Sequence, residues 1–261
     1  MLLYHRSCGM TGRRLARLLR LSSTRYFTDQ PVFIRWGNSC LVPNDQSINT
    51  ATSIALASHG LNSLVALVGA EVPTLKVYTT PPENLSKYPI LGRKIYHRAG
   101  TDIVWCNTPE EAQQSNRQFW TGYFPVHKEL RVHVFRGTPL RVFRKVPRRN
   151  DADMRVRTSV RGWGYQRVGH QHYTRGQEIA VQAVESLGLT FGGVDLGWNE
   201  ETKKYVVFEV NTAPSLNSIS LLYYGREFER YLLDKGVNYE PTGYNWTEKL
   251  ERATAGGDDT E

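Results

Sequence analysis

Two acidic side chains and one amide stand on a pair of segments that are otherwise apolar. Asp195 lies within Gly-Val-Asp-Leu, and Glu209 lies within Val-Val-Phe-Glu-Val, just before Asn211. A polar turn over residues 199–204 joins the segments, which predicts an antiparallel hairpin centred on Thr202, with residue i opposite residue 404 minus i. Asp195 then faces Glu209, and Asn211 points to the same side because side chains on a strand alternate between faces.

Two facing carboxylates repel each other unless a cation lies between them. An unpaired buried charge costs several kcal/mol, which argues against the alternative of a solvated hairpin with ordinary surface acids. Three hard oxygen ligands suit Mg²⁺, which keeps its other positions for water or phosphate oxygens. The hairpin therefore predicts a metal site made of Asp195, Glu209 and Asn211 that also holds phosphate.

The hairpin must be positioned by the elements that precede it. Apolar runs and 3.6-residue spacing predict strands at 2–4, 32–34, 90–96, 103–105, 131–136 and 140–144, and helices at 10–21, 53–69, 109–116 and 174–187. The 53–69 helix is broken near His59-Gly60. Prolines in the 79–89 region predict a linker. We expect a short α/β lobe over residues 1–77, a second unit over 78–250 and a disordered tail over 251–261.

Composition narrows the class of protein. The chain has 261 residues, 40% of them hydrophobic, and no run of 18 apolar residues, which excludes collagenous, disordered and membrane-spanning classes. Its three cysteines are widely spaced, which argues against a disulfide scaffold and favours the cytoplasm. A net charge of +8 favours anionic partners. The Arg-rich, acid-free stretch 1–25 leaves an organellar transit peptide as an alternative to a helix of the fold.

These residues resemble the ATP-grasp superfamily, and within it the branch of ribosomal-protein glutamate ligase and glutathione synthetase. In that branch a segment like Gly193 to Leu196 is followed by Glu209-Val210-Asn211 and Pro214, and its Asp, Glu and Asn bind the two Mg²⁺ ions that hold the ATP phosphates. The resemblance covers about residues 85–220. It implies an α+β ATP-grasp fold, with two α+β subdomains that clamp the nucleotide, behind a short N-terminal α/β lobe. The reduced first lobe resembles short bacteriophage members.

The resemblance also implies roles for residues outside the hairpin. Lys94 would reach the α- and β-phosphates, under a glycine loop that contains His97 and Gly100. Tyr123 and Phe124 would form the hinge against adenine, and Glu129 would lie near the ribose. The cations that hold the acceptor and the acyl phosphate would be Arg131, Arg144 and Arg157.

Two departures from the family pattern leave other functions open. The usual second lysine is absent from His59-Gly60-Leu61-Asn62-Ser63, and the hinge around Gly122 lacks its usual acid. The basic stretch from Arg141 to Arg161, with aromatic residues interleaved, also suits nucleic acid, but no nucleic-acid module surrounds it. The histidines at 170 and 172 lack further zinc ligands at helical spacing.

The sequence as a whole predicts an ATP-dependent carboxylate-amine ligase. With ATP and Mg²⁺, it would form an amide through an acyl phosphate from small-molecule or peptide carboxylate and amine substrates, in the cytoplasm and away from membranes. Nucleic acid is disfavoured as a partner. The alternatives are an ATP-grasp kinase that stops at phosphoryl transfer, and a nucleotide- or nucleic-acid-binding protein without turnover. The oligomeric state cannot be read from the sequence.

Overall fold

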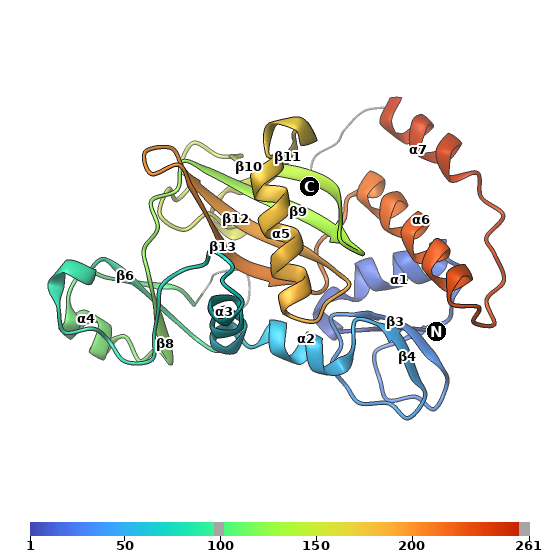
Figure 1. Cartoon of the computed structure of the whole chain (residues 1–261), viewed down its shortest axis with the longest axis horizontal. Helices are drawn as coiled ribbons and strands as arrows, with labels where there is room; N and C mark the ends of the chain where they lie inside the picture. The colour runs from blue at the N-terminus through green and yellow to red at the C-terminus, as the bar shows by residue number, and fades with distance from the viewer. Residues whose placement is uncertain (97–101, 256–261) are drawn as a thin grey trace.

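A computed structural model of the chain describes residues 1–96 and 102–255. Within these residues the strands form three sheets, with strand orders β2-β1-β3-β4, β5-β8-β6-β7 and β11-β10-β9-β12-β13. Figure 1 shows the sheet of β9 to β13 at the centre, the β6 and β8 region to its left, and the N-terminal strands below and to the right. Four short 3-10 helices complete the loops: η1 (Arg6–Cys8), η2 (Leu85–Lys87), η3 (Ser159–Arg161) and η4 (His170–His172).

The first sheet is parallel throughout. It contains β1 (Leu2–Tyr4), β2 (Ser23–Thr24), β3 (Val32–Trp36) and β4 (Asp45–Ile48). The helix α1 (Gly9–Leu18) packs against it through Leu15 and Ala16, which are buried, while Arg13 and Arg17 face solvent. Gly12 is required here, because a Cβ at this position would lie 2.6 Å from the Cβ of Tyr4. The predicted helix over 10–21 is therefore present in a shorter form.

Two apolar helices follow the first sheet. They are α2 (Ala51–Ser58) and α3 (Gly60–Gly69), and His59 separates them where the sequence predicts a break. In the described part of the chain, no single helix is long and apolar enough to cross a membrane; α2 and α3 meet such a test only as a pair, by length and composition, with a bend of 101° between them.

The small sheet is antiparallel, and the proline-containing segment joins its first two strands in the chain. It consists of β5 (Val77–Tyr78), β6 (Ile90–Arg93), β7 (Val104–Cys106) and β8 (Phe119–Gly122), with α4 (Pro109–Gln114) beside it. The strand predicted over 90–96 ends at Arg93, and β8 was not expected. The short Phe-Trp-Thr-Gly run of β8 becomes a strand because β5 and β6 pair with it on both sides.

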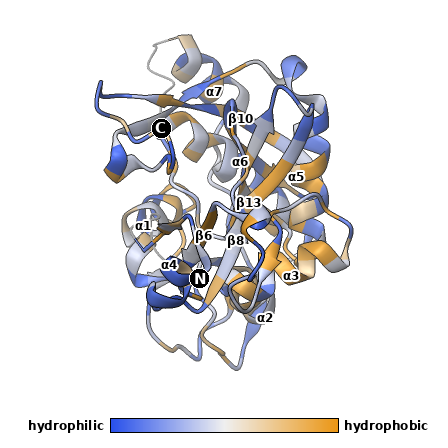
Figure 2. Cartoon of the chain, turned by 90° about the vertical axis from the view of Figure 1, so that its left-hand side faces the viewer, coloured by the Kyte–Doolittle hydropathy of each residue, from blue (hydrophilic) through white to orange (hydrophobic). Residues whose placement is uncertain are grey.

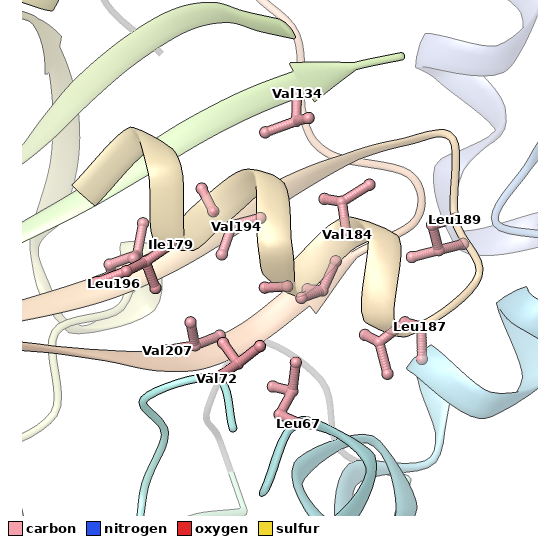
Figure 3. Packing of buried hydrophobic residues seen from close by; sticks show 14 of the residues in the cluster. Leu67, Val72, Val134, Ile179, Val184, Leu187, Leu189, Val194, Leu196 and Val207 are labelled. Atoms are coloured by element: carbon pink, nitrogen blue, oxygen red, sulfur yellow. The ribbon is translucent and has the colours of Figure 1, made fainter. Parts of the chain in front are cut away.

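The large sheet is also antiparallel. It contains β9 (Lys128–Phe135), β10 (Thr138–Pro147), β11 (Trp163–Arg167), β12 (Phe191–Asn199) and β13 (Lys204–Asn211), and α5 (Thr174–Ser186) packs on one face. Side chains from α5, α3 and that face of the sheet form one buried cluster, which Figure 3 shows around Ile179, Val184, Val194 and Val207. Figure 2 shows the apolar residues of α3 and α5. The opposite face of the sheet is left for the polar residues of β9, β10 and β12.

Two C-terminal helices complete the fold. In α6 (Ser218–Asp234), Tyr224 and Phe228 share a buried cluster with Trp36 of β3, so this helix packs with the N-terminal lobe, beside α1 in Figure 1. The division into units 1–77 and 78–250 stays a prediction. The disordered tail predicted over 251–261 is wrong for its first five residues, because α7 spans Trp246–Ala255 and buries Leu250; residues 256–261 lie outside the described chain.

Candidate active site

Strands of the large and small sheets line one cavity of about 390 Å³. The loop over residues 148–162, between β10 and β11, contributes the segment from Met154 to Ser159 to its wall. Asp153 holds this loop in place, because its side chain accepts hydrogen bonds from the amide of Arg155 (2.8 Å) and from Nη1 of Arg161 (2.6 Å). The cavity therefore has a wall from each sheet and a structured loop between them.

Part of the cavity lining is apolar and aromatic. It includes Leu75, Leu91, Ile103, Tyr123, Phe124 and Phe208. Tyr123 packs edge-to-face on Trp105 with ring centroids 4.8 Å apart, and Phe124 packs on Phe208 at 6.4 Å. Tyr123 and Phe124, the residues for which the sequence predicts a hinge, thus line the cavity, and these rings have the character that a flat heteroaromatic ligand requires.

Another part of the lining is a cross-strand row of charged side chains. On β9, the residues Glu129, Arg131 and His133 face away from α5. The residues that alternate with them, Leu130, Val132 and Val134, are buried, and Val132 and Val134 belong to the core cluster that includes α5. The strand register places Arg131 opposite Asp195, and Asp195 opposite Glu209. Three charges from three adjacent strands therefore lie in one line on the cavity face of the sheet.

Arg131 and Asp195 form a bidentate ion pair at the centre of this row. The Nε and Nη2 atoms of Arg131 each donate to a carboxylate oxygen of Asp195 at 2.8 Å, and both side chains are buried. The ring of Tyr165 lies over the guanidinium, with its centroid 4.4 Å from Cζ, and its hydroxyl donates to Asp195 at 3.5 Å. Burial raises the pKa of the Tyr165 phenol well above its usual value, so it stays protonated and able to donate.

A β-bulge brings Glu209 and Phe208 into the cavity together. The register pairs Asp195 with Glu209 but Leu196 with Val207, so Phe208 is the extra residue. The predicted pairing of Asp195 with Glu209 is confirmed. The predicted register is wrong nearer the turn, where Asn199 pairs with Lys204. Without the bulge, that turn would place Phe208 opposite Asp195.

Asn211 connects the two carboxylates. Its Nδ2 donates to Oε1 of Glu209 at 3.0 Å and to Oδ2 of Asp195 at 3.5 Å. Oxygen-bearing side chains thus converge, and two carboxylates with one amide are a donor set that fits a hard cation such as Mg²⁺. In the described ranges no group of three His, Cys, Asp or Glu side chains could hold a metal. The sequence predicts a metal because two facing carboxylates repel each other unless a cation lies between them. This reason is wrong, because Arg131 already balances the charge of Asp195.

A second ion pair lies beside the first row. Lys145 of β10 pairs with Glu129 of β9, both side chains are about 8% exposed, and the Lys145 ammonium also donates to the carbonyl of Arg157 at 2.6 Å. Burial raises the pKa of Glu129, while the charge of Lys145 opposes this shift. The acid predicted near the ribose therefore lines the cavity, already paired with a lysine.

Arg157 lies in the loop that borders the cavity. Its Nη2 donates to the carbonyl of Val126 at 2.6 Å, and its guanidinium lies 4.8 Å from the ring centroid of Trp163. Its buried Nε has no hydrogen-bond partner in the structure as described. Burial lowers the pKa of Arg157. This arginine is thus placed at the cavity, as predicted, with one donor group unsatisfied.

The structure does not bring two predicted cations into the cavity. Lys94 lies beyond the end of β6, pairs with Asp102 at 3.5 Å and has a side chain that is 48% exposed. Arg144 alternates with Phe143 and Lys145 along β10 and so points to the opposite face of the sheet from Lys145. His97 and Gly100, the predicted glycine loop, lie outside the described residues.

Arg93, the residue before Lys94, is the cation of β6 that lines the cavity. It is buried, and its Nε donates to Oγ1 of Thr121 at 3.1 Å. Burial lowers the pKa of Arg93, and the charge of Glu209 opposes this shift. Alternation along β6 could have identified it, because Leu91 and Arg93 share one face while Ile90 packs in the core of the small sheet.

The cavity also contains residues outside the predicted site, among them Lys145, Tyr165 and Phe208. The alternation of side chains along β10 separates Lys145 from the predicted Arg144. Tyr165 is one of the aromatic residues interleaved with the basic stretch. Phe208 enters the cavity through the bulge, for which the residues themselves contain no clear signal.

No protein-family model and no curated protein sequence matches this chain. Solved structures do. The macrocyclase MdnC from Microcystis aeruginosa MRC, bound to the precursor peptide MdnA, is similar over 90% of this chain and 99% of its own, with a TM-score of 0.59 and 10% identity. The ATP-grasp ligase PsnB, solved with a phosphomimetic variant of its minimal precursor, Mg and ADP, is similar over 83% and 89%, with a TM-score of 0.57 and 10% identity.

A third similar structure is a carboxyaminoimidazole ribonucleotide synthase from Aspergillus clavatus in complex with ATP. It has a TM-score of 0.50 and 14% identity over 65% of this chain, and the chain spans about half of that enzyme, 48% of its length. At these identities the similarities establish the fold alone. The chain has an α+β ATP-grasp fold, as the sequence predicts.

Proposed function

We propose that this protein is an ATP-dependent carboxylate-amine ligase that forms an amide through an acyl phosphate. The observation that carries the proposal is a single cavity lined both by aromatic rings, at Tyr123 and Phe124, and by charged side chains, at Arg131, Asp195 and Glu209. Such a lining matches a nucleotide, whose base would contact the aromatic rings and whose phosphates would lie among the charged groups. The ATP-grasp fold supports this orientation.

Different residues of the cavity would bind different parts of the nucleotide. The aromatic side chains would hold the base, and Glu129 would lie toward the ribose. Arg93 would contact the phosphates from the small sheet, in the role that the sequence assigned to Lys94. Asp195, Glu209 and Asn211 would hold Mg²⁺, which neutralises phosphate charge and aligns the transfer when bound.

The reaction has two steps that balance in atoms and charge. A substrate carboxylate oxygen attacks the γ-phosphorus, and the bond from that phosphorus to the bridging oxygen breaks, which gives an acyl phosphate and ADP. An amine nitrogen then attacks the acyl carbon, loses a proton and expels inorganic phosphate. Arg157 would stabilise the oxyanion that develops in this second step, and its unsatisfied buried Nε supports this role.

The finer assignments belong to the same proposal. They are membership of the glutamate ligase and glutathione synthetase branch, a bacteriophage-type origin, a cytoplasmic location, and small-molecule or peptide substrates. The peptide complexes of MdnC and PsnB support peptides as one substrate class.

Hydroxylamine trapping tests the proposed chemistry. The full chain is incubated with MgATP, hydroxylamine and pooled amino acids or acidic peptides, and hydroxamate and ADP are measured together. We expect hydroxamate in proportion to ADP, because hydroxylamine intercepts an acyl phosphate. A stable phosphorylated product without hydroxamate would identify the kinase alternative instead. ADP binding without any turnover would identify a nucleotide-binding protein that has lost activity.

A further inference from the structure

The guanidinium of Arg131 lies next to Asp195, in the position where the predicted metal site would have a metal ion. Both oxygens of Asp195 accept hydrogen bonds from Arg131 at 2.8 Å, and the Asp195 side chain is only 6% exposed. A side-on pair of this kind is the strongest hydrogen-bonded arrangement that a carboxylate makes with a side chain. Asp195 therefore carries no unbalanced charge to attract a divalent ion.

The neighbouring amide is also turned against metal binding. The Nδ2 atom of Asn211 faces both Glu209 and Asp195, at 3.0 and 3.5 Å. An N–H group donates to a carboxylate but cannot ligate a cation. Asn211 would have to rotate its amide by half a turn to present its oxygen.

Tyr165 gives Arg131 a second contact besides Asp195. Its ring lies over the guanidinium, with the centroid 4.4 Å from Cζ, and this cation-π contact attracts the guanidinium independently of the carboxylate. Arg131 itself lines the cavity, where the phosphates of a bound nucleotide would offer it a second set of anionic oxygens. A nucleotide therefore supplies what the metal alone lacks, which is a new partner for the displaced arginine.

We infer that Arg131 is an internal counter-ion of the metal site: it neutralises Asp195 in the nucleotide-free protein, so a divalent metal binds tightly only together with a nucleotide that takes over Arg131. This inference rests on the proposed function, because it requires a nucleotide in the cavity. Arg131 is in this sense a positioning residue for the metal ligands. Linkage requires that nucleotide and metal each raise the affinity for the other by the same factor.

The test measures Mn²⁺ binding to the full chain by electron paramagnetic resonance of free Mn²⁺, with and without ADP. For wild type we expect weak binding of Mn²⁺ alone and at least about tenfold tighter binding with ADP present. Arg131→Met should bind Mn²⁺ alone about tenfold more tightly than wild type, since it removes a close positive charge. The same variant should lose most of the coupling to ADP.

Two controls make the result specific. Arg175→Met removes an exposed arginine of α5, which pairs with Glu178 and does not line the cavity, and should leave Mn²⁺ affinity unchanged. Adding Asp195→Asn to Arg131→Met should abolish the gain, because the released carboxylate is then missing. Thermal melting confirms that each variant folds, and Arg131→Gln, which also removes the charge but keeps a polar side chain, replaces the methionine variant if that one does not fold.

The possible results distinguish a failure of the counter-ion role from a failure of the proposed function. A folded Arg131→Met (or Arg131→Gln) that binds Mn²⁺ no more tightly than wild type overturns the counter-ion role, whether or not ADP binds. Wild type that binds Mn²⁺ equally well with and without ADP also overturns it. Wild type that binds no ADP in the presence of Mn²⁺ contradicts the proposed function itself.

Discussion

Two arginine-aspartate pairs in this chain, each with a buried arginine, have the same chemistry and different surroundings. In the N-terminal lobe, Arg35 is fully buried and donates to Asp45, with Nη2 2.8 Å from Oδ2. Its other hydrogen bonds go to the hydroxyl of Ser47 and to the carbonyls of Asn38 and Cys40, at 3.0, 3.0 and 2.6 Å. The pair thereby ties the 38–45 loop to the end of β3, and no ligand is needed to complete it.

Arg131 and Asp195 belong to the cavity face of the large sheet instead. Glu209 lies directly beyond Asp195 on the next strand, and the amide of Asn211 bridges the two acids. A second carboxylate next to the pair makes the site able to accept a further cation, and the cavity gives that cation access. The comparison shows that the surroundings of an ion pair, more than its geometry, decide whether it stabilises a loop or prepares a binding site.

The largest expected effect separates the two pairs by activity. Glu209→Gln removes one carboxylate beside Arg131 without changing side-chain volume, and we expect Mg²⁺-dependent ATP turnover to fall about 1000-fold or more, since metal ligation contributes several kcal/mol. Asp195→Asn should have a similar effect. ADP release measures turnover, and a melting temperature close to that of wild type shows that the fold is intact. Turnover of Glu209→Gln at the wild-type rate would remove this residue from the site.

Arg35→Met should lower the stability of the fold and leave nucleotide binding largely unchanged. It leaves the cavity unchanged but takes the buried partner from Asp45 and its donors from two carbonyls, so we expect the free energy of unfolding to fall by about 3 kcal/mol. Urea unfolding followed by circular dichroism measures the loss. ADP affinity of the folded fraction should stay within about twofold of wild type. A selective loss of ADP binding at unchanged stability would contradict the structural role of this pair.

A smaller effect distinguishes Arg93 from its neighbour Lys94. Arg93→Met should weaken ADP binding about tenfold, because a charge-assisted contact to phosphate contributes roughly 1.5 kcal/mol or more. Lys94→Met is the matched control and should change ADP affinity by less than about twofold, as an exposed ion pair contributes little. Isothermal titration calorimetry with ADP measures both. The reverse order of effects would restore the phosphate role to Lys94.

The smallest expected effect is a pH dependence of the stability that Asp45 contributes. Burial alone would raise the pKa of this carboxyl, but hydrogen bonds from Arg35 and Ser47 bring it below its usual value. A depressed pKa stabilises the fold above the unfolded-state value of about 4, and this contribution is lost as the pH falls below it. The difference in unfolding free energy between wild type and Asp45→Asn should therefore shrink from pH 6 to pH 3. A constant difference would mean that Asp45 does not titrate as part of the pair.

Several elements of the fold could be predicted from the local pattern of apolar and turn residues in the sequence. The break at His59, the strand pair around Gly137 and the helix before β12 follow from periodicity and turn residues, which act between near neighbours. The helix α6 was not predicted. Its apolar face is mixed with Tyr, Arg and Glu residues and is completed by the β-strands of the N-terminal lobe, which lie far away in the sequence.

The residue types and spacing of the 193–211 hairpin by themselves determined the acids of the site and the antiparallel pairing of their two strands, because pairing across a short turn is a local property. The bulge then set the pairing of Asp195 with Glu209. Only the tertiary structure decided which cation meets them. Arg131 lies 64 residues before Asp195 and reaches it because β9 pairs with β12, a choice that depends on packing against α5 and not on any local motif. The bulge that admits Phe208 and the end of β6 that selects Arg93 over Lys94 were decided in the same way. Local sequence sets which face of a strand a side chain occupies, whereas the register between distant strands sets what that side chain meets.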